Sequence, residues 1–249
     1  GLAESACFIS QLALAFSFTR DTCPGMWFFY IGLANIFATN VVLLALLTWA
    51  HQSPRFAAHR ISSKPGMKVA PAERLRTMML IGTLSLVIVV GGTYALQTQL
   101  IRSGPTPWWR VLVDALLVLV LYDFLYYALH RTLHHKKLMR FVHGVHHRAR
   151  NPSALESFFQ HPFELALGLG LLLFCSWIVG PMSVWSFFIA FFVYSNLNII
   201  IHSGLALPGL LMWPTTLITK KHHVHHQDDF SKNFASLTPL PDLIFGTLG

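Results

Sequence analysis

Histidine is the residue type that stands out in this sequence. Of the fourteen histidines in the 249-residue chain, twelve lie between His130 and His226. The neutral imidazole ring is a good ligand for iron, zinc, copper and nickel, and its proton exchanges near neutral pH. The enrichment therefore indicates metal or proton chemistry in the second half of the chain.

The histidines of this region fall into three short motifs, HRTLHH, HGVHH and HHVHH. Within each motif they recur three or four residues apart, so a helical backbone would bring their rings together on one face. The rings predicted to converge are those of His130, His134, His143, His146, His147, His222, His225 and His226. Eight imidazoles exceed the four ligands that tetrahedral zinc takes, and two metal ions therefore fit better than one. We expect His51, His59 and His135 at the surface, and His223 to be a spare.

Several other chemistries lack their motifs in this chain. There is no HExxH zinc-peptidase motif, no Glu-x-x-His pair of the carboxylate-bridged di-iron proteins, and no GxGxxG turn for a flavin or nicotinamide. The three cysteines show no CxxC spacing and form no cluster that could hold iron and sulfur. We therefore expect the chain to bind no haem, flavin or NAD.

The elements that must position the histidines are membrane helices. Hydrophobic residues make up 54% of the chain and charged residues 11%, with a mean hydropathy of +0.53, which is too apolar for a soluble domain of this size. Spans are predicted over residues 26–50, 77–101, 108–129, 162–179 and 182–201. Residues 2–19 fit an extra span, a lumenal helix or part of a processed signal segment. The sequence thus predicts an all-α integral membrane bundle of four to six transmembrane helices, in one domain over residues 1–249.

Basic residues orient this bundle. Fifteen of the eighteen Lys and Arg residues lie in segments 51–76, 130–161 and 202–249, which alternation of the spans places on one side. Enrichment in Lys and Arg marks that side as cytoplasmic. All fourteen histidines share it, so we predict a cytoplasmic histidine-rich helical cap, formed by 130–161 and 202–249, that holds a dimetal site. The net charge of +8 comes from short loops between apolar runs, and we expect no nucleic-acid partner.

From Asp123 to Gly249, half of the chain, the sequence resembles the integral-membrane fatty acid hydroxylase and sterol desaturase superfamily. The mark of that family is HxxxH, then HxxHH, then a distal HxxHH. The resemblance is closest in DFLYYALHRTLHH, FVHGVHH, ESFFQHPFE, IIHSG and PDLIFGTLG. It implies that the eight motif histidines hold two metal ions, iron in catalysis, that activate dioxygen on acyl chains, sterols or related lipids. Zinc is an alternative occupant in purified protein.

The resemblance also implies further ligands. His202, in IHSG, matches another family histidine, and His161, in HPFE, matches a motif of the sterol-type branch, either as a ligand or as a supporting residue. The acyl 2-hydroxylase branch has a second histidine four residues after the one that matches His202, and this chain has Ala206 there. The amide of Asn198 is either a substitute ligand or a hydrogen-bonding group within the bundle. This departure favours the sterol-type branch.

Two acidic residues are predicted to support the ligands. Asp123 lies two helical turns before His130, on the same face, and an acid buried in a membrane must be paired. A metal-bound imidazole usually donates its other N–H to a carboxylate or carbonyl. We expect Asp123 and Glu164 to accept such bonds, with an ion pair to Arg131 or another base as the alternative.

Together these features predict an oxidoreductase that hydroxylates or desaturates a membrane lipid, a sterol, fatty acyl chain or related isoprenoid, with dioxygen. Because the reaction needs two electrons, the resemblance implies a separate donor. This would be cytochrome b5 in the endoplasmic reticulum of a eukaryote, or a ferredoxin-type carrier at the inner membrane of a bacterium. A divalent-metal transporter or metal-sensing membrane protein is the alternative, and it would place ligands deep within the spans. An inactive homologue with a structural metal is a third.

Overall fold

A computed structural model of the chain describes residues 26–64, 69–209, 213–227 and 230–249. All regular elements in these ranges are helices, so the predicted all-α class is confirmed. Residues 2–19, for which a further span was one of three interpretations, lie outside the described residues.

Five helices are long and apolar enough to cross a bilayer. They are α2 (Met26–Gln52), α3 (Pro71–Ala95), α5 (Trp108–Leu133), α8 (Pro162–Val179) and α9 (Val184–Ile201). Four of them agree with the predicted spans to within a few residues. The span predicted over 77–101 instead begins at Pro71, and a separate short helix, α4 (Gln97–Leu100), follows its end. The predicted bundle of membrane helices is otherwise confirmed.

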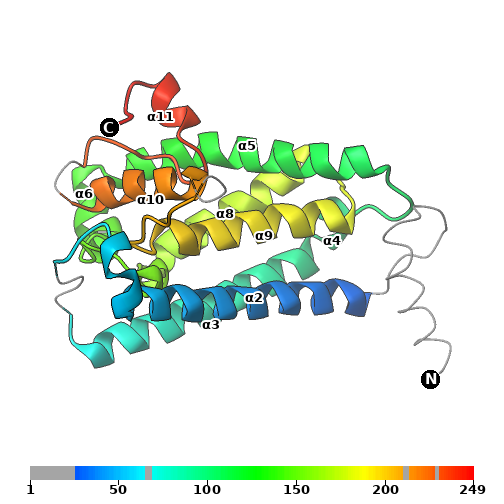
Figure 1. Cartoon of the computed structure of the whole chain (residues 1–249). Coiled ribbons are helices and arrows are strands. Elements are labelled where there is room, and N and C mark those ends of the chain that lie inside the picture. The colour runs from blue at the N-terminus through cyan, green and yellow to red at the C-terminus, as the bar shows by residue number, and fades with distance from the viewer. Residues whose placement is uncertain (1–25, 65–68, 210–212, 228–229) are drawn as a thin grey trace.

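Helix α5 packs against both α8 and α9, while α2 packs against α9 and α3 against α8 (Figure 1). Leu33 and Tyr122 are almost completely buried between these helices. Val41, Met79 and Leu116 are at least 60% exposed on the outer faces. Apolar side chains on the outside as well as the inside suit a bundle whose surroundings are lipid.

Two glycines allow the outer helices to approach the bundle closely. A Cβ atom added to Gly32 would lie 2.1 Å from the ring of Phe188, and one added to Gly92 would lie 2.5 Å from the side chain of Leu173. Close contact through small residues is the usual way in which membrane helices pack, because burial of apolar groups gives little driving force within lipid. These contacts fix α2 on α9 and α3 on α8.

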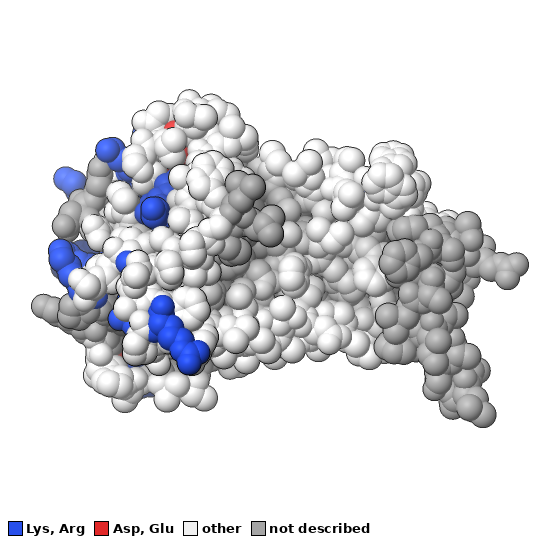
Figure 2. Space-filling view, in the orientation of Figure 1, with Lys and Arg blue, Asp and Glu red and all other residues white. Residues whose placement is uncertain are grey.

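The remaining elements form a cap at one end of the bundle (Figure 1). They are η1 (Pro54–His59), α6 (Lys136–Leu138), the π-helical turn η2 (Met139–His143), α7 (Gly144–His146), η3 (Ala154–Phe158), α10 (Trp213–His226) and α11 (Leu240–Ile244). Lys and Arg side chains gather at the same end, whereas the rest of the visible surface has almost none (Figure 2). The cap is thus the charged, water-facing end of the molecule.

Candidate metal centre

Nine histidines meet inside the cap, in two groups. Within each group, one ring nitrogen of every histidine lies within 4.8 Å of those of the others. The five-histidine cluster consists of His130, His134, His143, His147 and His225. The four-histidine cluster consists of His146, His202, His222 and His226. All are buried except His134, which is half-buried. The eight motif histidines and His202 are therefore the predicted ligands that the fold brings together.

In both clusters the Nε2 atoms point towards one another. The shortest Nε2–Nε2 distances in the five-histidine cluster are 2.9 Å for His130–His143, 3.0 Å for His143–His147 and 3.1 Å for His134–His225. In the four-histidine cluster they are 3.1 Å for His146–His202, 2.9 Å for His202–His222 and 3.0 Å for His222–His226.

The Nδ1 atoms of the five-histidine cluster show which nitrogen carries the proton. Nδ1 of His130 donates to the Phe234 carbonyl at 2.7 Å, and Nδ1 of His225 donates to the carbonyl of residue 232 at 2.7 Å. Nδ1 of His143 lies 2.8 Å from Oε1 of Glu164. Because a carbonyl oxygen only accepts, the proton of His130 and His225 must sit on Nδ1, which leaves the lone pair on Nε2.

The four-histidine cluster follows the same rule. Nδ1 of His146 donates to the Phe159 carbonyl at 3.1 Å, and Nδ1 of His202 donates to the Asn198 carbonyl at 2.6 Å. Burial lowers the pKa of His202 to about 3, and it lowers the pKa of the half-buried His134 to about 3 as well. At neutral pH the rings are therefore uncharged, with Nε2 lone pairs directed into each cluster.

This arrangement fits metal ions. Nε2 lone pairs about 3 Å apart repel one another unless a cation lies between them. With metal–nitrogen bonds of about 2.0–2.1 Å, two ligands at right angles lie about 2.9 Å apart, which matches the observed separations. Imidazole ligands suit iron, zinc, copper and nickel. Each cluster therefore has the donor set of a metal site.

The two sites are adjacent. The rings of His147 and His226, from different clusters, are stacked with their centroids 4.8 Å apart. Those of His143 and His146 are 5.7 Å apart. A pair of ions held here would share one enclosed space, as a dimetal centre requires.

The second and third motifs each supply both clusters in a regular way, whereas the first motif supplies only the five-histidine cluster. Each pair of histidines four residues apart serves one cluster: His143 with His147, and His222 with His226. The histidine between them belongs to the other cluster, which explains why His146 and His225 cross over. Residues at i and i+4 share a helical face, whereas the residue at i+3 is turned to one side. The motif HxxHH thus contributes to both clusters from one short stretch of chain.

The π-helical turn η2 sets the direction in which the histidine side chains of the second motif project. The Gly144 N–H donates to the carbonyl of Met139, five residues earlier, which is the bond that defines a π turn. A Cβ atom on Gly144 would lie 2.4 Å from that carbonyl oxygen. Only glycine therefore permits this turn, which directly precedes His146 and His147.

Glu164 and Asp123 take different positions. Glu164, in the first turn of α8, bonds a cluster imidazole as described above, and its other oxygen, Oε2, is buried without a hydrogen bond in the described part of the chain. Within the described residues, the hydrogen bonds of Asp123 go to groups other than imidazoles. Its carboxylate accepts the backbone N–H groups of Ser236, Leu237 and Thr238.

Three other candidates lie outside the clusters. His161 caps the N-terminus of α8, where its Nδ1 accepts the Phe163 N–H at 3.1 Å. Asn198 bonds His202 through its backbone carbonyl rather than its amide. His223 is buried but pairs with Gln227 at 3.0 Å.

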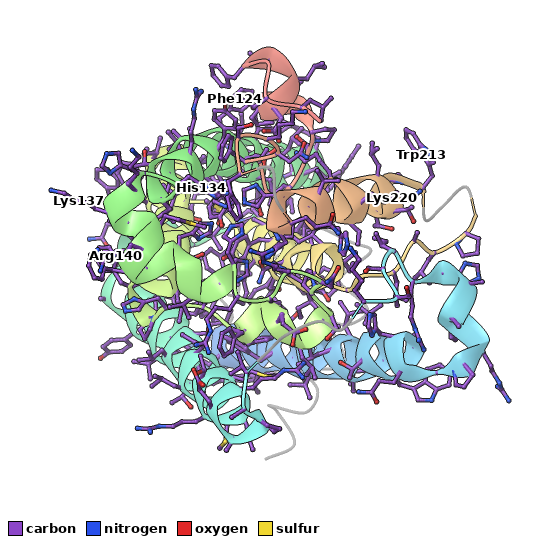
Figure 3. The ribbon with its side chains drawn as sticks, turned by 90° about the vertical axis from the view of Figure 1, so that its left-hand side faces the viewer. Phe124, His134, Lys137, Arg140, Trp213 and Lys220 are labelled. Carbon is purple, nitrogen blue, oxygen red and sulfur yellow. The ribbon has the colours of Figure 1, made fainter. Side chains whose placement is uncertain are left out.

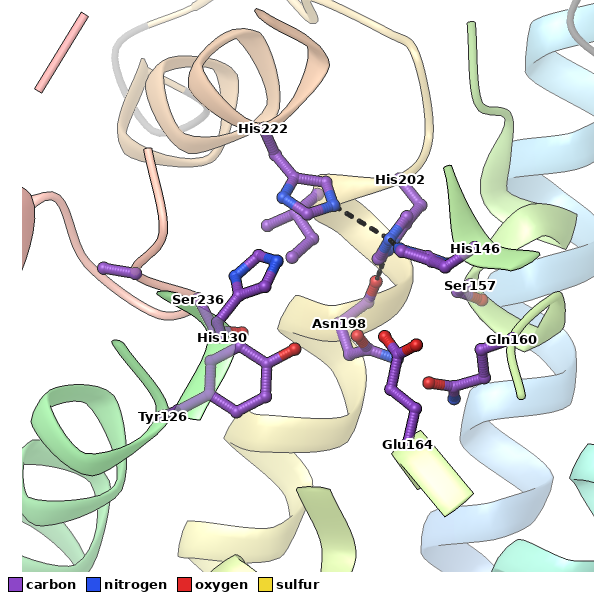
Figure 4. A pocket seen from close by; sticks show the side chains of 12 residues that line it. Tyr126, His130, His146, Ser157, Gln160, Glu164, Asn198, His202, His222 and Ser236 are labelled. Atoms are coloured by element: carbon purple, nitrogen blue, oxygen red, sulfur yellow. Dashed lines mark hydrogen bonds between the residues drawn. The ribbon is translucent and has the colours of Figure 1, made fainter. Parts of the chain in front are cut away.

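A small pocket opens between the clusters (Figure 4). Its walls include histidines of both clusters together with polar and apolar residues of α5, α8, α9 and the adjoining loops: Tyr126, His130, His146, Ser157, Gln160, Glu164, Asn198, Ile201, His202, His222, Ala235 and Ser236. It is the space from which a bound molecule would reach both metal sites. Figure 3, which faces the cap, shows Lys137 and Arg140 at its edge and His134 further in.

Sequence reasoning missed the backbone groups of the site. The carbonyls of Phe159 and Phe234 hold ligand rings, and a carbonyl leaves no trace in the residue type. Asp242 was also not among the predicted supporting acids. It is fully buried beside this region, and an acid within an apolar C-terminal segment was the available signal.

Comparison with known proteins assigns a family to the part of the chain that contains this site. The sequence profile of the fatty acid hydroxylase family matches residues 115–247, which include every histidine of both clusters. The chain therefore belongs to the fatty acid hydroxylase family.

Two kinds of relative have curated names. Methylsterol monooxygenase 1 of Rattus norvegicus is 32% identical over 146 residues, which cover 56% of this chain and 48% of that protein. Methylsterol monooxygenase 2-1 of Arabidopsis thaliana is 32% identical over 166 residues, covering 58% and 59%. A very-long-chain aldehyde decarbonylase of Oryza sativa subsp. indica is 32% identical over 187 residues, covering 70% and 67%. The chain thus spans about half the length of the methylsterol monooxygenases that it matches. No solved structure gives a significant match.

Proposed function

We propose that this chain is a single membrane-embedded domain that uses two iron ions and dioxygen to hydroxylate or desaturate a lipid. The observation that carries the proposal is the pair of adjacent clusters of inward-facing Nε2 atoms, nine in all, at the end of a bundle of membrane helices. Family membership supports the same class of reaction, and the names of the methylsterol monooxygenases favour a sterol over other lipids.

The residues of the site have distinct tasks. Iron held by imidazoles supplies dioxygen activation and the oxidation of an unactivated C–H bond. Burial keeps the rings neutral, and five of them are held in one orientation by an acceptor at Nδ1, so that these ligands need no reorganisation when metal binds; they are His130, His143, His146, His202 and His225. Burial of the clusters excludes bulk water from the reaction.

The pocket orients the substrate. Its lining includes Tyr126, Asn198 and Ile201, which come from the membrane helices α5 and α9, and we propose that the substrate enters between these helices. A lipid dissolved in the bilayer therefore needs no aqueous path to the metal sites. The polar walls near Glu164 and Gln160 suit the oxygen-bearing end of a product or substrate.

The charged cap supports a proposal for the electron donor and for the orientation. The exposed residues Lys136, Lys137 and Arg140 lie close in sequence to His134, the least buried ligand. An acidic carrier of the cytochrome b5 or ferredoxin type would be attracted to this surface. The excess of Lys and Arg at this end also supports a cytoplasmic position for the metal centre.

A divalent-metal transporter is less well supported. Transport through the bundle requires polar ligands along the spans. Of the cluster histidines, His130 lies inside a span, three residues from the end of α5 that adjoins the cap. Asp114, near the other end of α5, pairs with Arg110 at 3.6 Å.

The test uses the full chain purified in detergent and loaded with iron(II) without air. With a chemical electron donor and membrane lipid extract, we expect oxygen consumption and a lipid that gains one oxygen atom or loses two hydrogen atoms by mass spectrometry. His146→Ala should abolish turnover, because it removes a ligand of the four-histidine cluster.

The matched control is His135→Ala, which removes an exposed histidine next to a ligand but outside both clusters. It should leave turnover unchanged. Retained activity in His146→Ala, or binding of no metal by the wild-type chain, would contradict the proposal.

A further inference from the structure

One segment of the cap, residues 232–238, is held in an unusual way. Its five consecutive N–H groups from residue 234 to residue 238 all donate to two buried carboxylates. Those of Phe234 and Ala235 go to Asp242, at 2.7 and 3.0 Å. The next three go to Asp123, at distances of 2.8–3.1 Å. We call residues 232–238 the strap.

The two carboxylates are almost fully enclosed. Asp123 is 2% exposed and Asp242 is 0% exposed. Asp123 also accepts the hydroxyl of Thr238 at 2.6 Å, and Asp242 accepts the hydroxyl of Thr247 at 2.9 Å and pairs with the ammonium of Lys221. Hydrogen bonds to a buried carboxylate are charge-assisted and about twice as strong as neutral ones. They therefore fix the backbone of the strap.

The other side of the strap faces the metal ligands. The carbonyls of residues 232 and 234 accept the Nδ1 protons of His225 and His130, both at 2.7 Å. Between them, Asn233 has a left-handed φ of 59°, and its amide donates to the Lys221 carbonyl at 3.1 Å. The two buried carboxylates thus fix the backbone of the strap, and the carbonyls of the strap in turn fix the orientation of the His130 and His225 rings.

Both of these imidazoles belong to the five-histidine cluster. The known acceptors of the four-histidine cluster are the carbonyls of Phe159 and Asn198, which lie outside the strap. The Nδ1 acceptors found in the two clusters therefore come from different segments of the chain.

We propose that Asp123 and Asp242 are positioning residues for the five-histidine site alone, so that this site can lose its metal while the four-histidine site keeps its own. The inference rests on the proposed function only in that the clusters bind metal, and it is independent of the reaction and the substrate. Loss of a partner that orients a ligand imidazole typically weakens metal binding by about 10–100-fold.

The experiment measures cobalt(II) binding to the metal-free full chain in detergent, by competition with a chelator and by the visible absorption of the bound ion. For the wild type we expect two ions. For Asp242→Asn and Asp123→Asn we expect one ion of unchanged affinity and one weakened about 10–100-fold, with a changed absorption spectrum. Asp114→Asn is the matched control, since it neutralises a buried acid of α5 that lies outside the strap, and it should bind both ions normally.

If the aspartate variants do not fold, Thr238→Val removes one hydroxyl donor to Asp123 and preserves both charges. Its cobalt should leave in two phases in excess chelator, one of them faster than in the wild type. Equal weakening of both ions, or two ions with wild-type affinity and spectrum, would overturn the proposal. Failure of the oxygenase function would show separately, as two tightly bound ions without lipid oxidation.

Discussion

Glu164→Gln tests whether a carboxylate beside a ligand imidazole tunes metal binding. In the wild type, Oε1 of Glu164 lies 2.8 Å from Nδ1 of His143 inside the protein. Glutamine has the same shape and can still accept this bond through its oxygen, so the ring keeps its orientation and its proton on Nδ1. What the variant removes is the negative charge.

The size of the effect follows from this difference. A hydrogen bond to a charged group contributes about 1.5–3 kcal/mol, and a neutral one about 1 kcal/mol. The metal bound by His143 should therefore lose about 1–2 kcal/mol, which is roughly a 5–30-fold weaker affinity. The metal-free protein should not lose stability, because Oε2 of Glu164 is buried without a hydrogen bond and a buried charge is costly.

The assay has two parts, metal affinity by chelator competition and thermal unfolding of the metal-free protein. Glu73→Gln is the control, because Glu73 is an exposed acid that pairs with Arg148 at 2.7 Å on the cap surface. It should change neither measurement by more than a small amount. If Glu164→Gln binds metal as tightly as the wild type, or if stability and affinity fall together, Glu164 does not act through the charge that it presents to His143.

Three further predictions concern the cap. Gly144→Ala should lower the free energy of unfolding by about 1–3 kcal/mol and reduce metal content, because the added Cβ would lie 2.4 Å from the Met139 carbonyl oxygen. The control is Gly170→Ala in α8, where no atom lies within 4 Å of the added Cβ, and it should be neutral or stabilising in thermal unfolding. Asn198→Ala should retain both metals by elemental analysis, since its backbone carbonyl rather than its amide supports the ligand; loss of one ion would make the amide a ligand after all. The free energy of unfolding of the metal-free protein should decrease as pH falls from about 6.5 towards 3. Burial lowers the pKa of the His202 ring to about 3, so in this range the unfolded chain takes up a proton that the folded chain does not. The decrease should be about 2 kcal/mol per such ring between pH 6.5 and 5. Denaturant titrations at several pH values that show constant stability over this range would contradict it.

The membrane helices were predictable because their apolar runs are long. The exception is the start of α3. Hydropathy places the span after the charged residues Glu73, Arg74 and Arg76, but a helix can continue through charged residues outside the membrane. Glu73 pairs with Arg148 and Arg74 pairs with Glu156, so the first turns of α3 are part of the cap. Hydropathy reports transfer into lipid and contains no information about such contacts.

The sequence predicted which histidines would lie close together, but not how they would divide between the two clusters. Helical spacing brings the rings of each motif together, and their number indicates two metals. Which ring serves which metal depends on where the helix lies between the sites, and this is a tertiary property. The carbonyls that fix the rings, such as that of Phe234, depend on the backbone path of a loop and are equally invisible in the sequence.

The partition of the motifs also fixes the spacing of the two sites. His146 and His147 are consecutive residues that serve different clusters, and so are His225 and His226; in both pairs the ring centroids are 6.0 Å apart. Because successive residues of a helix are related by a fixed rotation and rise, this spacing is set by the local backbone and not by the packing of the bundle. Substitutions in the spans that leave these two short segments unchanged should therefore preserve this separation. A change of pitch at Gly144 would instead displace ligands of both clusters at once.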